Sequence, residues 1–80
     1  MLTPTTKRYG FVLFPDFTMI SLSASIEPLR MANRISGKQL YQYSLFSIDG
    51  LPVCASNGLS IGPITQISND NKLDALFICT

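Results

Sequence analysis

Residues 9–17 read YGFVLFPDF, and the first six of them form an unbroken apolar run that stops at Pro15-Asp16. An apolar run of this length, without polar alternation, is typical of a strand that is buried on both faces, as in a parallel sheet. From residue 18 to about residue 36, apolar residues recur at spacings of three and four, which predicts one face of an amphipathic helix. The residues of that face are Met19, Leu22, Ile26, Leu29 and Ala32.

The ends of this helix carry recognisable signals. Asp16 or Thr18 can cap its start through a side-chain oxygen, and Gly37 stands where a left-handed residue commonly ends a helix. Pro28 falls inside the helical pattern, so we expect it to kink the helix or to open a second helical segment. A basic stripe near the end is interpreted as a solvated face, with phosphate or DNA binding as the less favoured alternative; it consists of Arg30, Arg34 and Lys38.

The rest of the chain adds strands. Residues 41–48 and 73–79 are predicted to be two further buried strands, and residues 53–61 to be a short hairpin around Asn57-Gly58. Residues 64–72 are polar and predict a loop with at most one helical turn. Residues 1–8 are predicted to be a disordered tail. The order strand, helix, strand, hairpin, strand predicts α/β architecture, the first part of a flavodoxin-like parallel sheet sandwich.

This predicted sheet is incomplete. A parallel sheet needs helices on both faces, and the sequence contains one clear helix. One face of the sheet would therefore be bare. We interpret residues 9–80 as the N-terminal portion of a larger domain, and an oligomer that covers the bare face is the less favoured alternative.

Composition excludes several classes of function. The chain has 80 residues, 46% of them hydrophobic, and a formal net charge of +1, which argues against global disorder and against an electrostatic nucleic-acid binder. It has no histidine, and its two cysteines, Cys54 and Cys79, form no CxxC pair. We therefore predict no metal site, no cofactor and no disulfide framework. The apolar runs are too short for a signal peptide or a membrane span, which predicts a cytoplasmic protein.

Five stretches, taken in order, resemble the ThiJ/PfpI superfamily of class I glutamine amidotransferase-like domains. Residues 9–17 are similar to its FLLLPGF opening, and residues 27–33 (EPLRMAN) look like the EPLRAAN run of its regulator branch. Residues 41–50, 53–59 and 73–79 resemble the segments that follow. The resemblance covers about residues 9–79 and points to the sensor domain of GlxA-like regulators of the AraC/XylS class.

The resemblance implies a function for the parent protein. Such regulators carry a ligand-sensing, dimerising domain, followed by a C-terminal pair of helix-turn-helix motifs that bind DNA. This chain would be the N-terminal segment of the sensor, without DNA-binding motif or catalysis. The implied effector is a small nitrogen-containing metabolite, and the implied assembly is a homodimer with no membrane partner. The alternatives are a fragment of a ThiJ/PfpI-type enzyme (hydratase, glyoxalase or amidase-like) and a small stand-alone interaction module.

The chain departs from the family pattern at two positions. Alignment on Glu27 puts Ser21 where catalytic members carry Glu or Asp, and a serine cannot act as a carboxylate base, so we predict that the protein is not an enzyme. Asp16 replaces the glycine of the usual Pro-Gly, so the loop geometry there is expected to differ.

The candidate ligand-pocket residues are Asp16, Ser21 and Cys79, each with a structural alternative. Asp16 either binds the amine of a ligand or caps the helix. Ser21 either lines a pocket or lets the helix pack closely on the sheet. Cys79 follows a strand at the edge where open α/β sheets bind ligands, yet a small buried residue is its simpler role. Structural roles are predicted for Glu27, Pro28, Arg30 and Asn33.

Overall fold

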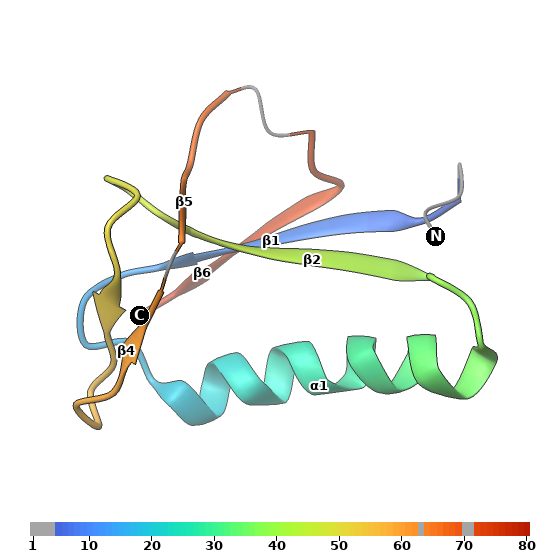
Figure 1. Cartoon of the computed structure of the whole chain (residues 1–80), viewed down its shortest axis with the longest axis horizontal. Coiled ribbons are helices and arrows are strands. Elements are labelled where there is room, and N and C mark those ends of the chain that lie inside the picture. The colour runs from blue at the N-terminus through green and yellow to red at the C-terminus, as the bar shows by residue number, and fades with distance from the viewer. Residues whose placement is uncertain (1–4, 63, 70–71) are drawn as a thin grey trace.

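The computed structural model describes residues 5–62, 64–69 and 72–80, in which one helix packs on a parallel sheet (Figure 1). The elements in chain order are β1 (Lys7–Leu13), α1 (Met19–Ser36), β2 (Tyr41–Ser47), β3 (Val53–Cys54), β4 (Ser60–Ile61), β5 (Thr65–Gln66) and β6 (Ala75–Cys79). The four strands of the main sheet run parallel in the order β5-β2-β1-β6, and β3 and β4 form a separate antiparallel hairpin. The predicted fold, an incomplete flavodoxin-like α/β sheet, is confirmed.

Strand β1 lies in the middle of the sheet, between β2 and β6. Its second half, Phe11 to Leu13, is buried, as the apolar run predicts. The strand begins earlier than expected, because Lys7 and Arg8 pair with Tyr41 and Gln42 of β2. The predicted tail is therefore wrong for these two residues, whose polarity fits the exposed start of the strand. Residues 1–4 of that predicted tail lie outside the described residues.

Helix α1 covers one face of the sheet with the apolar stripe that its spacing predicts. Leu22 is buried, and Met19, Ile26 and Leu29 pack against the same core. The prediction that the helix ends at a left-handed Gly37 is confirmed, because Gly37 has a φ of 69° and its N–H donates to the carbonyl of Asn33 at 3.0 Å. The predicted side-chain cap is wrong: Thr18 stands at the N-cap position, and no side-chain hydrogen bond caps the helix there.

Pro28 lies within one continuous helix of 18 residues, so the predicted second helical segment is wrong. A proline has no N–H to donate to the carbonyl four residues earlier, here that of Ala24. The contacts of neighbouring residues with the sheet offset that loss, because Ile26 and Leu29 on either side of the proline pack against the core.

The hairpin is confirmed, and the polar segment after it differs from expectation. Val53 pairs with Ile61 across β3 and β4. In the segment predicted to be a loop, the two residues of β5 pair in parallel with the end of β2. Thr65 and Gln66 are both exposed, so this edge strand has no apolar pattern by which its sequence reveals it.

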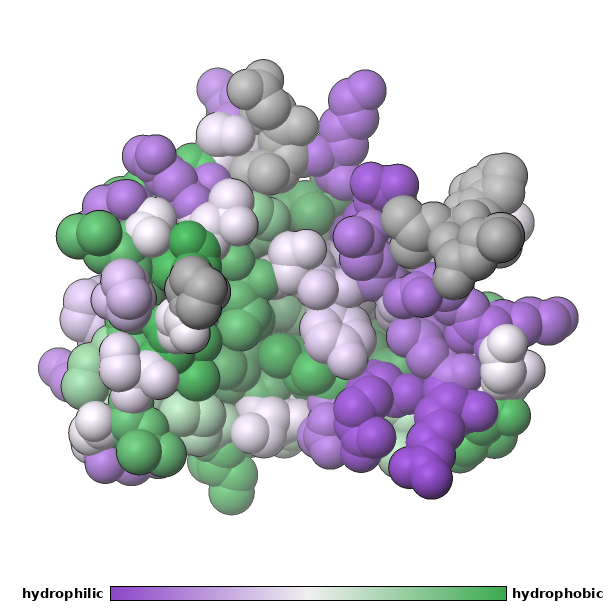
Figure 2. All heavy atoms as spheres, viewed as in Figure 1, coloured by the Kyte–Doolittle hydropathy of each residue, from purple (hydrophilic) through white to green (hydrophobic). Residues whose placement is uncertain are grey.

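The two faces of the sheet are covered to different degrees. Tyr9, Phe11 and Phe77 point to the face that α1 covers, here called the helix face, and Gly10 lies on the far face. The prediction that one face of the sheet would be bare is wrong in part, because Leu73 crosses the far face directly over Gly10. Figure 2 shows apolar side chains gathered around the middle of the molecule and hydrophilic ones at the right, where the strands begin in Figure 1.

Strand β6 is not buried, although its apolar sequence predicts that it is. Leu76, Phe77 and Ile78 are 47%, 45% and 68% exposed. The reason is position: β6 lies at the outer edge of the sheet, next to β1, on the side away from β2.

Candidate functional site

The carboxyl ends of the strands meet the amino end of α1 and the β3-β4 hairpin at one end of the molecule, at the left of Figure 1. The chain leaves β1 to form β2 on one side and later returns to form β6 on the other side. The strand order thus reverses at β1. Open α/β sheets bind their ligands outside the carboxyl ends of the strands at such a point.

Backbone hydrogen bonds hold the loop between β1 and α1 in place from two directions. On the β6 side, Phe14 N–H donates to the carbonyl of Cys79 at 3.0 Å, and Thr18 N–H donates to that of Thr80 at 3.4 Å. On the hairpin side, Asp16 N–H donates to the carbonyl of Cys54 at 2.8 Å. Phe17 is fully buried between these anchors. The loop is therefore a fixed part of the site.

Asp16 occupies a left-handed backbone conformation, with a φ of 66°. The geometry of the loop is thus one that glycine adopts freely, although the residue is an aspartate. Its carboxylate is exposed and accepts no hydrogen bond from the part of the chain that the structure describes. The other described carboxylates have partners: Glu27 pairs with Arg30, Asp49 accepts from Leu51 N–H, and Asp74 accepts from Arg8 N–H.

Ser21 and Cys79 lie at the same end of the molecule but differ in surroundings. Ser21 is exposed in the first turn of α1, and its carbonyl accepts a hydrogen bond from the Ser25 hydroxyl at 2.9 Å. Cys79 is partly buried against the core, and this burial raises the pKa of its thiol. A raised pKa leaves less of the thiolate, the form that acts as a nucleophile. Among the described residues, no hydrogen bond joins the side chains of Asp16, Ser21 and Cys79.

The cavity at this end lies on the β2 side of β1, whereas Cys79 lies on the β6 side. A hollow of about 380 Å³ is lined by Leu13, Phe14, Pro15, Ser47, Ile48, Asp49, Pro52, Val53 and Cys54. Sequence reasoning did not single out Ser47 or assign Asp49 to a site. Ser47 is the last residue of β2 and Asp49 follows the strand, where it forms a turn by accepting bonds from Leu51 N–H at 3.0 Å and from the Ser47 hydroxyl at 3.4 Å. Because the sequence Asp49-Gly50 predicts a turn, it gives no sign that Ser47 and Asp49 line a cavity.

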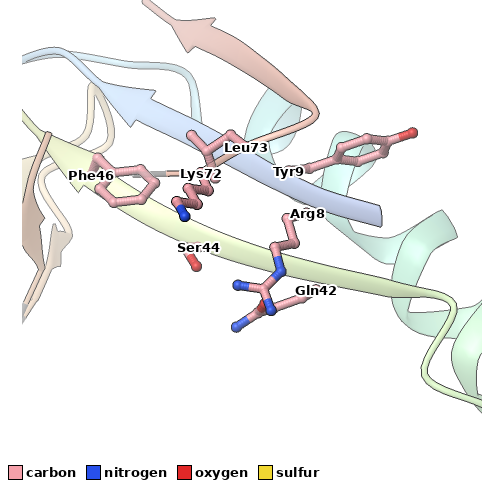
Figure 3. Close-up of a pocket in the computed structure, with 7 residues that line it drawn as sticks. All are labelled: Arg8, Tyr9, Gln42, Ser44, Phe46, Lys72 and Leu73. Atoms are coloured by element: carbon pink, nitrogen blue, oxygen red, sulfur yellow. The ribbon is translucent and has the colours of Figure 1, made fainter. Parts of the chain in front are cut away.

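A second, smaller hollow lies near the start of the strands. Figure 3 shows its lining, with Arg8 extending from β1 toward Gln42 of β2 and Lys72 extending over the same strand. The hollow measures about 120 Å³ and sits on the far face, beneath Leu73. It is remote from the carboxyl ends of the strands, so we do not include it in the candidate site.

The EPLRMAN segment carries one exposed ion pair within α1 and one contact, made by Asn33, that joins α1 to the sheet. Glu27 and Arg30 form a two-pronged ion pair with both N···O distances at 2.8 Å, and this hydrogen bonding lowers the pKa of Glu27. Asn33 bonds to both backbone groups of Tyr41: its Nδ2 donates to the carbonyl, and its Oδ1 accepts from the N–H, each at 2.9 Å. Asn33 thereby joins the last turn of the helix to the first residue of β2.

The described part of the chain holds no group of three or more cysteine, aspartate or glutamate residues arranged to bind a metal ion. Within the same residues, no helix has the length and apolarity needed to cross a membrane.

Comparison with known proteins gives a consistent set of relatives. No family model matches the sequence. Over 73 residues, 91% of this chain, it is 46% identical to the HTH-type transcriptional regulator GbdR of Pseudomonas aeruginosa and 39% identical to CdhR of the same species. It is 36% identical to the HTH-type regulator GlxA of Rhizobium meliloti over the same length. The chain spans 20 to 22% of the length of these relatives.

A solved structure agrees with these sequence relatives. The crystal structure of an AraC family transcriptional regulator from Pseudomonas putida matches 91% of this chain and 46% of its own, with a TM-score of 0.82 and 29% identity. Sequence and fold therefore lead to one family, as the EPLRMAN segment predicted: the chain is homologous to the N-terminal, GlxA-like part of AraC-type transcriptional regulators.

Proposed function

We propose that residues 9–80 form the first part of the effector-sensing and dimerising domain of an AraC-type transcriptional regulator. The observation that carries this proposal is the identity of 36 to 46% with three HTH-type regulators along nearly the whole chain. The net charge of +1 gives the chain itself no electrostatic hold on DNA. DNA binding therefore belongs to a helix-turn-helix region elsewhere in the regulator, which acts in the cytoplasm.

The proposal assigns no catalytic step to this chain. Ser21 stands where the enzymes of the superfamily that it resembles carry a carboxylate, and a serine hydroxyl cannot serve as the corresponding base. The thiol of Cys79 has a raised pKa, which makes it a poor nucleophile. Both residues instead form part of the wall of a ligand site.

The effector in this proposal is a small metabolite with a cationic nitrogen, and Asp16 is the residue that recognises it. Three features of Asp16 support this role. Its carboxylate is exposed and has no partner among the described residues. Backbone hydrogen bonds hold its loop in place, at the point where the strand order reverses. A carboxylate fixed in this way can accept a charge-assisted hydrogen bond from an ammonium group without first reorganising.

A chimera tests the proposal. The segment of GbdR that aligns with this chain is replaced by the chain, and transcription from a GbdR-dependent reporter is measured against a panel of amino acids, amines and quaternary ammonium compounds. We expect at least one of these compounds to raise transcription. A chimera that is folded and occupies the promoter but responds to no member of the panel would contradict the sensing role.

The matched control variant is Asp16→Asn in the same chimera. Asparagine tolerates the left-handed conformation as aspartate does, so the loop is kept while the charge is removed. Loss of a charged hydrogen bond is expected to raise the half-activating concentration by about tenfold or more. An unchanged concentration would remove Asp16 from the effector site and leave the sensing role intact.

A further inference from the structure

We propose that the effector is a linear diamine, which places one ammonium group at Asp16 and the other in the hollow beside β1 and β2, at Asp49. This inference rests on the proposed function and adds the chemical class of the effector. The hollow measures about 380 Å³, within the range of about 300–1,000 Å³ that is common for small-molecule sites. It adjoins Asp16, because its lining includes Pro15, the preceding residue, and Cys54, whose carbonyl accepts from Asp16 N–H.

The walls of the hollow are mostly apolar. Aliphatic, aromatic and proline residues make up most of its lining: Leu13, Phe14, Pro15, Ile48, Pro52 and Val53. Such walls favour a ligand with a chain of methylene groups, because each methylene group is stabilised when it leaves water. The two prolines have no backbone N–H and therefore offer no hydrogen bond to an anionic group of a ligand.

The polar side chains of the lining are available as acceptors. The hydroxyl of Ser47, a residue only 2% exposed, donates to the Leu51 carbonyl at 3.0 Å and over a longer distance to Asp49 Oδ1 at 3.4 Å, so its oxygen is left to accept. Asp49 Oδ1 also accepts from Leu51 N–H, and its Oδ2 has no partner among the described residues. The Cys54 thiol donates to the Ala55 carbonyl at 3.6 Å. These groups fit a ligand that brings donors, and an ammonium group brings three N–H groups.

The distribution of charge selects against an anionic group on the ligand. Asp16 and Asp49 lie at the carboxyl ends of the strands, whereas Figure 2 shows hydrophilic side chains gathered at the end where the strands begin. The lysines and arginines occupy the start of β1, the second half of α1 with the turn after it, and the segment before β6: Lys7, Arg8, Arg30, Arg34, Lys38 and Lys72. A carboxylate on the ligand would therefore meet two like charges and no cation of the described residues, whereas two ammonium groups would meet one carboxylate each.

The two carboxylates follow neighbouring strands. Val12 of β1 pairs with Phe46 of β2, and Asp16 and Asp49 come shortly after these two residues in their own segments. Adjacent strands lie about 4.8 Å apart, a separation that a few methylene groups can bridge. A linear diamine can therefore lay its methylene chain along the apolar walls and bring one ammonium group to each carboxylate. A monoamine satisfies only one of them.

The first test titrates the unmodified chimera and measures transcription. The probes are linear diamines of three to six carbons, the monoamines of the same lengths, and ornithine, which is the four-carbon diamine with an added carboxylate. We expect the best diamine to half-activate at a concentration about tenfold or more below those of the best monoamine and of ornithine. An equal or stronger response to a monoamine, an amino acid or a quaternary ammonium compound would overturn the diamine assignment and leave the sensing role in place. A chimera that responds to no compound would overturn both.

Variants of the chimera separate the two carboxylates. Asp49→Asn keeps the Oδ1 acceptor for Leu51 N–H and removes the charge, so it is expected to raise the half-activating concentration of the best diamine about tenfold and to leave that of the best monoamine unchanged. Asp16→Asn is expected to raise both. Asp74→Asn is the matched control, because its carboxylate lies at the start of β6, where it accepts from Arg8 N–H at 2.7 Å, and it should change neither. An equal effect of Asp49→Asn on diamine and monoamine, or no effect on either, would overturn the role of Asp49.

Discussion

At the scale of single residues, Asp16 combines a strained backbone conformation with a carboxylate that has no partner among the described residues. A non-glycine residue in the left-handed region is strained by about 1 kcal/mol. We therefore expect Asp16→Gly to raise the free energy of unfolding by a few tenths to about 1 kcal/mol, and Asp16→Ala to lower it by about as much. Urea unfolding at fixed protein concentration measures both changes. Equal stabilities of the glycine and alanine variants would show that the backbone at Asp16 is not strained.

Asn33 is the second residue whose contribution to stability can be predicted from its hydrogen bonds. Removing its amide leaves Tyr41 N–H without its partner at a half-buried position, which costs about 1–3 kcal/mol. The Tyr41 carbonyl keeps a bond from the Gln39 side chain at 3.1 Å. Thermal unfolding of Asn33→Ala is expected to show this loss. Glu27→Ala is the control, because its ion pair is exposed and its removal should change the unfolding temperature little.

The sequence indicated the position of Asp16 but not its conformation. Its place after a buried strand predicted that it would lie near the ligand-binding edge of the sheet. Nothing in the local sequence shows that the carbonyl of Cys54, 38 positions away, anchors its N–H and holds it in the left-handed region. That contact depends on the β3-β4 hairpin packing against the loop, which is a property of the folded chain.

At the scale of elements, Gly10 determines how closely the chain can pass over β1. A Cβ at this position would lie 2.6 Å from Leu73 Cδ1 and 2.9 Å from Phe46 Cε2. We expect Gly10→Ala to lower stability by about 1–3 kcal/mol, since the far face must open to admit the methyl group. The double variant with Leu73→Ala should recover part of that loss, because the two side chains share one space. Additive losses in urea unfolding would indicate that Leu73 does not pack on Gly10 in solution.

The same scale shows which elements the sequence could predict. Three elements carry strong local signals, and all three are found. Strand β1 has an unbroken apolar run, helix α1 has apolar residues at spacings of three and four, and the hairpin has Asn57-Gly58 at its turn. Strand β5 could not be predicted, because two exposed polar residues show no apolar periodicity. The continuity of α1 through Pro28 depends on tertiary packing, which overrides local propensity, and the exposure of β6 follows from its place at the edge of the four strands that the structure describes.

At the scale of the whole molecule, the proposed effector site depends on segments that are far apart in the sequence. The carboxyl ends of the strands lie beside the β3-β4 hairpin and the start of α1 (Figure 1). Cys79 and Thr80 at the end of the described chain, and Cys54 in the hairpin, accept the backbone hydrogen bonds that hold the Asp16 loop. An effector bound at Asp16 would therefore be coupled through this loop to both β6 and the hairpin.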